Sequence, residues 1–567
     1  MNMKPIIYQV FTRLFGNRNT TNKEWGTIAE NGVGKMNDFD NAILRRIKTL
    51  GATHVWFTGV IRHASQTDYT SHGIPCQHPD VVKGVAGSPY AITDYYDIDP
   101  DIAVDTEHRM DEWLALIDRA HKIGLKVVMD FVPNHVAREY QSICKPEEVK
   151  DLGEDDCTDW HFARDNNFYY IDAPLDLSNV EGGAMKDDVP QSASTCSEHS
   201  RYKESPARAT GNDVFSSTPS RNDWYETVKL NYGIDYCDAG GRSEHFSPIP
   251  DTWDKMTDIL LFWAQKGVDA FRCDMAEMVP AAFWAWATDK VKFQYPEVKF
   301  IGEVYNPDEY RKYISAGFDW LYDKVGMYDC VRDVMCNRRS TSDITNQWQQ
   351  TNDILDNMLY FLENHDEQRI ASDFFAVDAR RGIPGLIVCA LLNTSPFMLY
   401  AGQEFGERGM DKEGFSGRDG RTTIFDYWCV DTLHRGYFNR RLLHKDEKML
   451  EAAYKQILTL ANSERVVSEG QFYDLMYVNR HIADRQFAFL RKHERETLLV
   501  VSNFDDRPIE CDITIPRHAF DFLQIAEGTY TAVDLLTNSD LELSLRPDSA
   551  ISIDLPPLGG VVLKISC

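Results

Sequence analysis

Four short apolar segments of this chain each end in an acidic residue. The four acids are Asp130, Asp274, Glu303 and Asp366. Burying an unpaired carboxylate is costly, so acids at the ends of buried strands need a chemical reason. A β/α barrel builds its active site from polar residues at the carboxyl ends of several strands. The pattern therefore predicts an α/β fold, a (β/α)8 TIM barrel, with a functional site at one end of its strands.

Apolar runs alternate with amphipathic stretches up to about residue 450, which is typical of repeated βα units. We expect helices over residues 39–50, 112–123 and 252–265, the first of them capped by Asp38 and each followed closely by a glycine. The eight expected strands are 6–11, 54–58, 126–131, 268–274, 299–303, 318–322, 358–363 and 397–400.

The spacing of the acids predicts the domain organisation. Asp274 and Glu303 are 29 positions apart, close to the roughly 30 residues of one βα unit, whereas Asp130 and Asp274 are 144 positions apart. An irregular subdomain, rich in Asp, Ser, Asn, Gly and Pro, is therefore expected after the third strand. Past residue 455, short alternating strands predict an antiparallel β-sandwich. We expect two barrel parts at 1–135 and 251–450, an inserted subdomain B at 136–250 and a C-terminal domain at 455–567.

Composition limits the classes of binding partner and the cellular compartment that we expect for this protein. The chain of 567 residues has 88 acidic and 60 basic residues, a formal charge of -28, which argues against nucleic acid as a partner. No apolar stretch reaches the roughly 20 residues of a membrane span, so no membrane partner is expected. The first residues lack an apolar leader with a cleavage site, so we expect a cytoplasmic protein. The twelve cysteines form no CxxC pair and are expected to be reduced.

The strand ends carry complementary acids. Arg272 and Asp274 lie two positions apart on one strand and so point to the same side. Arg272 should lower the pKa of Asp274 and keep it ionised, as a nucleophile requires. Glu303 follows an apolar run that should raise its pKa, which suits a proton donor, and Asp366 supplies a third acid. Two acids with opposite pKa requirements are what glycoside hydrolysis needs, so we predict Asp274, Glu303 and Asp366 as catalytic residues.

The same residues stand in motifs that resemble the four signatures of the α-amylase superfamily, glycoside hydrolase family 13. The motifs are DFVPNH (130–135), GVDAFRCD (267–274), IGEV (301–304) and ENHD (363–366), and SPYAITDY (88–95) resembles a segment whose Tyr stacks on the cleaved sugar. The resemblance implies that Asp274 is the nucleophile, Glu303 the acid/base and Asp366 the stabiliser of the transition state. It also implies substrate binding by Tyr90, His135, Arg272 and His365.

The function that this resemblance implies is retaining hydrolysis of α-1,4-glucosidic bonds in α-glucans or maltooligosaccharides. An exo-acting α-glucosidase or a transglycosylase on the same scaffold is an alternative, because sequence motifs do not fix loop shape or water access. A non-catalytic, amylase-like binding protein is an alternative of another class. The presence of all three acids argues against it.

No cofactor is expected for the chemistry, and no metal ligand is assigned. The resemblance allows a structural calcium ion, since Asn134 matches one of its ligands. However, Glu277 and Met278 stand where many α-amylases have a Lys-His pair connected to that site. His63, His72, Cys76 and His78 share one loop, but their spacing fits no standard metal site, and a substrate-facing loop is the preferred interpretation.

Overall fold

Eight parallel strands close into a barrel in the order β1-β16-β15-β14-β13-β12-β5-β2. The computed structural model describes residues 3–181, 201–410, 412, 415 and 417–566. All eight predicted strands are confirmed, and with them the predicted barrel. Their bounds are β1 Ile6–Phe11, β2 His54–Thr58, β5 Lys126–Phe131, β12 Ala270–Cys273, β13 Lys299–Gly302, β14 Trp320–Tyr322, β15 Met358–Phe361 and β16 Phe397–Tyr400.

Helices follow the strands and pack outside them. The cap of the first of these, α3, is Asp40, whose side chain accepts hydrogen bonds from the backbone N–H groups of Ala42 and Ile43. The predicted cap, Asp38, is wrong by two residues: it closes the preceding turn by accepting from the N–H of Lys35. The helices are α3 Asn41–Thr49, α4 Arg109–Ile123, α7 Asp251–Gln265, α8 Ala281–Gln294, α9 Tyr310–Ser315, α10 Asp329–Met335, α11 Ser342–Gln350, α12 Gly382–Leu391 and α14 Lys445–Ser463.

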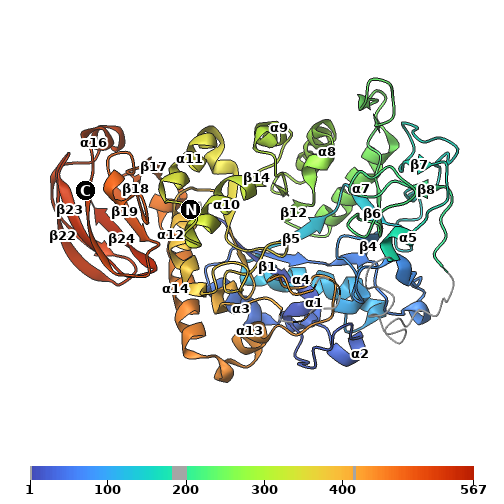
Figure 1. The fold of residues 1–567 in the computed structure, drawn as a ribbon, viewed down its shortest axis with the longest axis horizontal. Coiled ribbons are helices and arrows are strands. Elements are labelled where there is room, and N and C mark those ends of the chain that lie inside the picture. The colour runs from blue at the N-terminus through green and yellow to red at the C-terminus, as the bar shows by residue number, and fades with distance from the viewer. Residues whose placement is uncertain (1–2, 182–200, 411, 413–414, 416, 567) are drawn as a thin grey trace.

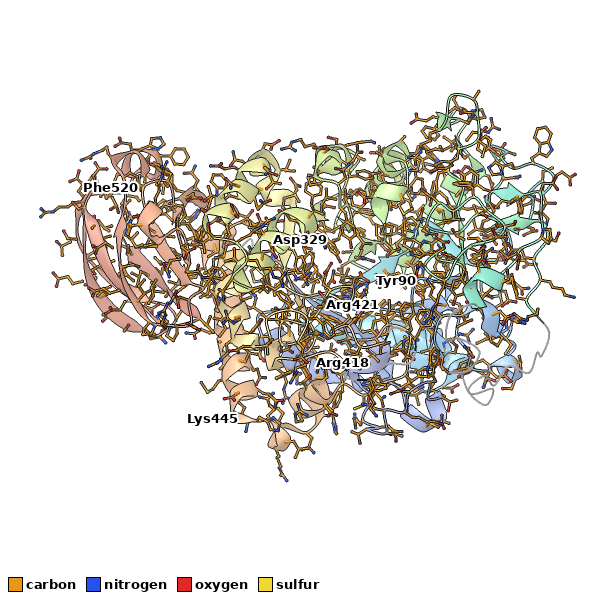
Figure 2. The ribbon with its side chains drawn as sticks, viewed as in Figure 1. Tyr90, Asp329, Arg418, Arg421, Lys445 and Phe520 are labelled. Atoms are coloured by element: carbon orange, nitrogen blue, oxygen red, sulfur yellow. The ribbon has the colours of Figure 1, made fainter. Side chains whose placement is uncertain are left out.

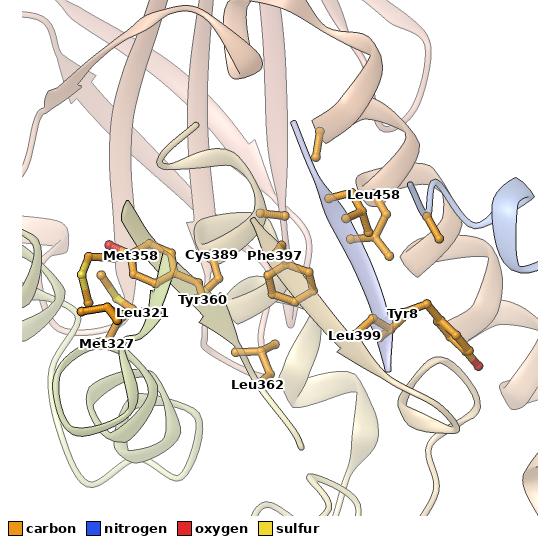
Figure 3. Packing of buried hydrophobic residues seen from close by; sticks show 14 of the residues in the cluster. Tyr8, Leu321, Met327, Met358, Tyr360, Leu362, Cys389, Phe397, Leu399 and Leu458 are labelled. Carbon is orange, nitrogen blue, oxygen red and sulfur yellow. The ribbon is translucent and has the colours of Figure 1, made fainter. Parts of the chain in front are cut away.

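Alternation along the strands separates an inner layer of side chains from an outer one. The inner cluster takes at least one residue from every barrel strand: Ile7, Trp56, Val128, Ala270, Ile301, Tyr322, Leu359, Phe361 and Met398. Residues of the opposite parity pack outward against the helices; Figure 3 shows Tyr8, Tyr360, Phe397 and Leu399 of this outer layer together with Leu458 of α14. Two positions after an inner apolar residue, toward the carboxyl ends, come Gln9, Asp130, Arg272 and Glu303. The barrel interior thus changes from apolar to charged along its length.

Two irregular segments interrupt the βα pattern near the carboxyl ends of the strands. After β2, β3 (Ile61–His63) and β4 (Ile92–Ile98) form an antiparallel pair. Between β5 and α7 the described residues form three two-stranded sheets. Their strands are β6 His135–Ala137, β7 Tyr170–Ile171, β8 Ala207–Arg208, β9 Thr227–Lys229, β10 Ile234–Asp235 and β11 Ser243–Glu244. Figure 1 shows this inserted segment at the end of the molecule opposite the C-terminal strands.

The C-terminal region is antiparallel, as predicted. A six-stranded sheet has the order β17-β18-β19-β24-β21-β22, and β20 pairs with β23. The strands are β17 Gln471–Asp474, β18 Gln486–His493, β19 Glu496–Asn503, β20 Ile509–Thr514, β21 Gly528–Asp534, β22 Ser539–Leu545, β23 Ala550–Leu555 and β24 Gly559–Ser566. Among the described residues, no helix is both long enough and apolar enough to span a bilayer.

The cysteines differ from the prediction at one position. Cys76 takes part in a disulfide bond, so the expectation that all cysteines are reduced is wrong there. Nine other cysteines within the described ranges are free. Cys196 and Cys567 lie outside the described residues. The absence of a CxxC pair did not exclude this bond, because a disulfide joins residues that are close in space rather than in sequence.

Candidate active site

Arg272 is the centre of the polar end of the barrel. Its side chain is fully buried, and its guanidinium lies 2.9 Å from a carboxylate oxygen of Asp274 and 2.8 Å from one of Glu303. Asp130, its neighbour in register on β5, lies 3.6 Å away. One arginine therefore contacts three carboxylates that the sequence places on three adjacent strands. A planar guanidinium can hold several carboxylates in fixed positions at once.

Asp274 has a raised pKa rather than the lowered one that we predicted. Burial raises it most, and the charge of Glu303 adds to that effect, whereas Arg272 opposes it. Asp130, held by Trp56 through a 3.1 Å hydrogen bond, also has its pKa raised by burial, to about 7. The prediction considered the arginine alone. It missed that several acids share that arginine in a site with little water.

Glu303 is held by donors that come from two loops. Its carboxylate accepts a hydrogen bond from the backbone N–H of Met275 at 2.8 Å and from the Tyr305 hydroxyl at 2.6 Å. Met275 has φ +43°, a left-handed conformation that is uncommon for a side chain of this kind. Glu277 accepts from the backbone N–H groups of Tyr305 and Asn306 and so fixes the loop that carries Tyr305.

His365 connects the third acid to the aromatic wall. Its Nε2 lies 3.1 Å from Asp366 and also contacts the Tyr90 hydroxyl, while its Nδ1 lies 2.8 Å from the Gln9 amide nitrogen. Burial, followed by the charge of Arg272, lowers the pKa of His365 to about 3. His365 is therefore neutral at physiological pH, and it orients Tyr90 and Asp366 without adding a positive charge.

Five of the seven predicted site residues line one cavity of about 260 Å³, namely Tyr90, His135, Asp274, Glu303 and Asp366. Figure 2 places Tyr90 near the middle of the molecule, away from the C-terminal strands. Arg272 and His365 lie behind this lining, with side chains that are fully buried. These two residues act on the cavity through the acids and the tyrosine that they contact.

The structure adds residues that the sequence did not single out. Tyr305 lies two positions after Glu303, so the alternation along an extended segment could have suggested it. Lys83, Trp224 and Glu226 also line the cavity, but they come from the loop between β3 and β4 and from the inserted segment. These segments have no regular period, so no sequence signal indicated that their side chains turn toward the barrel.

Asn134, which the sequence suggested as a calcium ligand, is hydrogen-bonded to a lysine. Its side-chain oxygen accepts a hydrogen bond from the ammonium group of Lys229 at 2.9 Å, and Lys229 lies 2.5 Å from Asp213. Lys229 is buried. A divalent cation needs several oxygen ligands that are free of competing positive charge. The residues around Asn134 therefore do not fit a calcium ion.

Elsewhere in the described ranges, one group has the spacing of a metal site: Asp94, Asp97 and Cys144. Arg62 lies 3.4 Å from Asp94, and Arg109 donates a 2.7 Å hydrogen bond to Asp97. These arginines already neutralise the two carboxylates, so the group is better explained as an ion-pair network. The loop histidines singled out in the sequence do not form a metal-like group among the described residues.

The chain is similar to known proteins over most of its length. The family model "Alpha amylase, catalytic domain" matches residues 9–188 and 248–457. α-Amylase 3 of Dictyoglomus thermophilum is 22% identical over 528 residues, covering 88% of this chain and 84% of that protein. Neopullulanase 2 of Thermoactinomyces vulgaris is 21% identical over 577 residues, covering 96% and 76%.

Solved structures show the same fold. The maltogenic α-amylase AmyB of Thermotoga neapolitana superposes with a TM-score of 0.62 at 17% identity, covering 100% of both chains. An α-amylase of Geobacillus thermoleovorans, solved with acarbose, gives 0.64 at 18% identity, covering 100% of this chain and 98% of that one. The family model covers more than half of the chain, and the solved structures share its barrel. The chain belongs to the α-amylase family of glycoside hydrolases, family 13.

Proposed function

We propose that this protein is a retaining glycoside hydrolase that cleaves α-1,4-glucosidic bonds in α-glucans or maltooligosaccharides. The observation that carries the proposal is the pair of acids on one arginine: Asp274 and Glu303 both contact Arg272, and both line the same cavity. Retaining glycosidases need two carboxyl groups close together on either side of one glycosidic bond.

In the first step, Asp274 attacks the anomeric carbon and the bond to the leaving oxygen breaks. Glu303 gives its proton to that oxygen, so the leaving sugar departs as a neutral alcohol and Glu303 becomes a carboxylate. In the second step, Glu303 takes a proton from water, whose oxygen attacks the same carbon and releases Asp274. The two inversions leave the product in the α configuration.

The two acids and Arg272 form one connected group of charges. Asp274 and Glu303 contact the same guanidinium, and the charge of Glu303 raises the pKa of Asp274. Two acids so close together favour a state in which one proton is held between them. Two hydrogen bonds, from Met275 and Tyr305, fix the Glu303 carboxyl group in position. The first step requires that proton on Glu303 when the sugar is bound.

The remaining cavity residues fit a role in sugar binding. Tyr90 offers an aromatic face, and Asp366 and His135 offer polar atoms for hydroxyl groups. Hydroxyl contacts that strengthen as the ring flattens lower the barrier, because they bind the transition state better than the substrate. The names of the relatives, α-amylase and neopullulanase, support an α-glucan as the substrate class.

We also propose an exo-acting α-glucosidase as the second candidate function. The cavity of about 260 Å³ is smaller than the roughly 300–1,000 Å³ typical of ligand pockets, which favours a short substrate.

We further propose that Lys229 stands in place of a structural calcium ion. The ammonium group of Lys229, between Asn134 and Asp213, supplies the positive charge that would hold the inserted segment to the barrel.

The test is to incubate the protein with maltoheptaose and, separately, with an aryl α-glucoside, and to follow products and anomers by NMR. Early products from the middle of the chain, first appearing as the α anomer, are expected for an amylase. Glucose released from the chain end as the α anomer would favour the exo-acting candidate. First products in the β configuration, or no release of sugar from any α-glucan, would overturn the proposal.

A further inference from the structure

We propose that Lys83 and Glu226 form a second substrate-binding unit, in which Glu226 accepts a hydrogen bond from one particular hydroxyl group of the bound sugar. The inference rests on the proposed function, since it assigns the hydroxyl recognition of that same cavity. None of the motifs in the sequence includes either residue.

The two residues form a buried ion pair in the cavity wall. The ammonium nitrogen of Lys83 lies 2.9 Å from Oε1 of Glu226, and both residues line the cavity that also contains the three acids. Lys83 is 9% exposed and Glu226 is 4% exposed. The ammonium of Lys83 also lies 5.4 Å from the centre of the Tyr225 ring. A pair removed from water this far is more than a surface ion pair of small effect.

The second carboxylate oxygen of Glu226 is the important atom. Oε2 is buried and has no hydrogen-bond partner among the described residues. A buried acceptor without a donor costs free energy, unless something else in the functional state supplies that donor. A sugar carries several hydroxyl donors, and a hydrogen bond from one of them to a carboxylate is charge-assisted. Glu226 lines the cavity, so a hydroxyl group of a bound sugar is the donor that we assign to this atom.

Two backbone contacts, one to each segment of the pair, hold Lys83 and Glu226 in place before the substrate arrives. Glu226 directly precedes β9, and its carbonyl oxygen accepts a hydrogen bond from the N–H of Arg138 at 3.0 Å. Lys83 is followed by Gly84, which has φ +66° and packs so closely on the carbonyl of Phe425 that an added Cβ would lie 2.3 Å from that oxygen. A group that is fixed in advance can discriminate between hydroxyl positions, because it does not move to follow the ligand.

The test compares wild type with Glu226→Gln on aryl α-maltosides that each lack one sugar hydroxyl. Glutamine keeps the shape but removes the charge. On the complete substrate, we expect kcat/KM of the variant to fall by about 10- to 100-fold, the effect of losing a charge-assisted hydrogen bond. On one particular deoxy substrate, wild type and variant should have the same kcat/KM, because the hydroxyl that Glu226 recognises is already missing.

A purely structural role for the pair predicts a different pattern. The loss in Glu226→Gln would then be equal on every deoxy substrate, and this outcome, or no loss at all, would overturn the inference. Glu244→Gln is the matched control, since Glu244 is exposed on β11 of the same inserted segment; its kcat/KM should equal that of wild type on all substrates.

A folding measurement and a second variant distinguish loss of recognition from loss of the fold. Thermal unfolding shows whether Glu226→Gln is folded. If it is not, the same series is run with Glu226→Asp, which keeps the charge but withdraws the oxygen by one methylene and should give the same substrate pattern. Failure of the proposed function would appear as wild type that cleaves no α-glucan. Failure of this inference alone would appear as active wild type with a uniform loss in the variants.

Discussion

The two ends of the barrel differ in how their buried charged groups are paired. At the amino ends of the strands, the ammonium of Lys4 donates hydrogen bonds of 2.6 and 2.8 Å to the backbone and side-chain oxygens of Asn393. Arg491 donates to the carbonyl groups of Leu392 and Val467 at 2.6 Å each. These cations meet neutral acceptors. Burial lowers the pKa of Lys4 well below its usual value and that of Arg491 to about 10.

At the carboxyl ends, acids gather around too few cations. Asp130, Asp274 and Glu303 all contact Arg272, and burial raises the pKa of Asp130 to about 7 and that of Asp274 as well. Atoms such as Oδ1 of Asp130 and Oε2 of Glu226 have no hydrogen-bond partner in the described part of the chain.

The two ends of the barrel therefore differ in what their buried polar groups contribute: stability at one end and chemistry at the other. Buried polar groups that satisfy one another, as at the amino ends, add to stability and specify the fold. Groups that repel one another and lack partners cost stability, and natural proteins keep such groups mainly where function needs them. Substitution at the polar end of this barrel should therefore change activity most, and replacing one of its raised-pKa acids should not lower stability.

The largest expected effect is that of Asp274→Asn. This change keeps the shape of the side chain but removes the proposed nucleophile, so kcat should fall by a factor on the order of 10³ or more, about 4 kcal/mol of barrier. The matched control is Asp269→Asn near the other end of the same strand, where Asp269 accepts from the N–H of Val127; its kcat should stay close to wild type. Steady-state kinetics on maltoheptaose measure both, and near-normal turnover in Asp274→Asn would refute its role as the nucleophile.

The pH dependence tests the raised pKa of Asp274. Activity should fall on the acid side at a higher pH than an ordinary aspartate would give, because protonation inactivates the proposed nucleophile. An acid whose pKa is higher in the native than in the unfolded state stabilises the native state at pH values below the unfolded-state pKa. That stabilisation is lost as pH rises through the native-state pKa. Asp274→Asn should therefore melt at a higher temperature than wild type at pH 7, with a smaller difference at pH 5. A variant that is less stable than wild type at pH 7 would contradict this.

A smaller effect, on stability alone, is expected for Lys4→Met. The change leaves two oxygens of Asn393 without their donor, so the free energy of unfolding should fall by about 1–3 kcal/mol. kcat/KM should not change, because Lys4 lies at the other end of the barrel. Lys445→Met, on an exposed residue at the start of α14 (Figure 2), is the control and should stay within about 0.5 kcal/mol. A loss of activity without a loss of stability in Lys4→Met would break the comparison between the two ends.

The smallest effect should come from calcium. Because Lys229 already engages Asn134 and Asp213, adding calcium or a chelator should leave the melting temperature of wild type unchanged. Lys229→Met should lower the melting temperature, because it removes the donor between two oxygens. A rise of several degrees in wild type on adding calcium would show that a divalent ion binds and that the proposed substitution by Lys229 is wrong.

Much of the catalytic barrel could be predicted from local patterns. The eight strands, the placement of Asp274 beside Arg272 and the position of Glu303 on the next strand all follow from alternation and from spacing of about 30 residues per βα unit. The cap at Asp40 and the disulfide at Cys76 were missed. A cap depends on which of several nearby aspartates meets the first turn, and a disulfide depends on contacts between distant segments.

The sequence by itself determined the barrel, the order of its strands and the acids at their carboxyl ends, because repeating periods and motif spacing are local properties of the chain. Only the tertiary structure decided the environment of those acids. The pKa of Asp274 is raised first by burial and then by the charge of Glu303, with smaller effects of Asp366 and Asp130. Strands far apart in sequence create this environment. The pair of Lys83 and Glu226 likewise exists only because two irregular segments fold over the same cavity. Charge interactions depend on distance in space, which spacing along a chain does not specify.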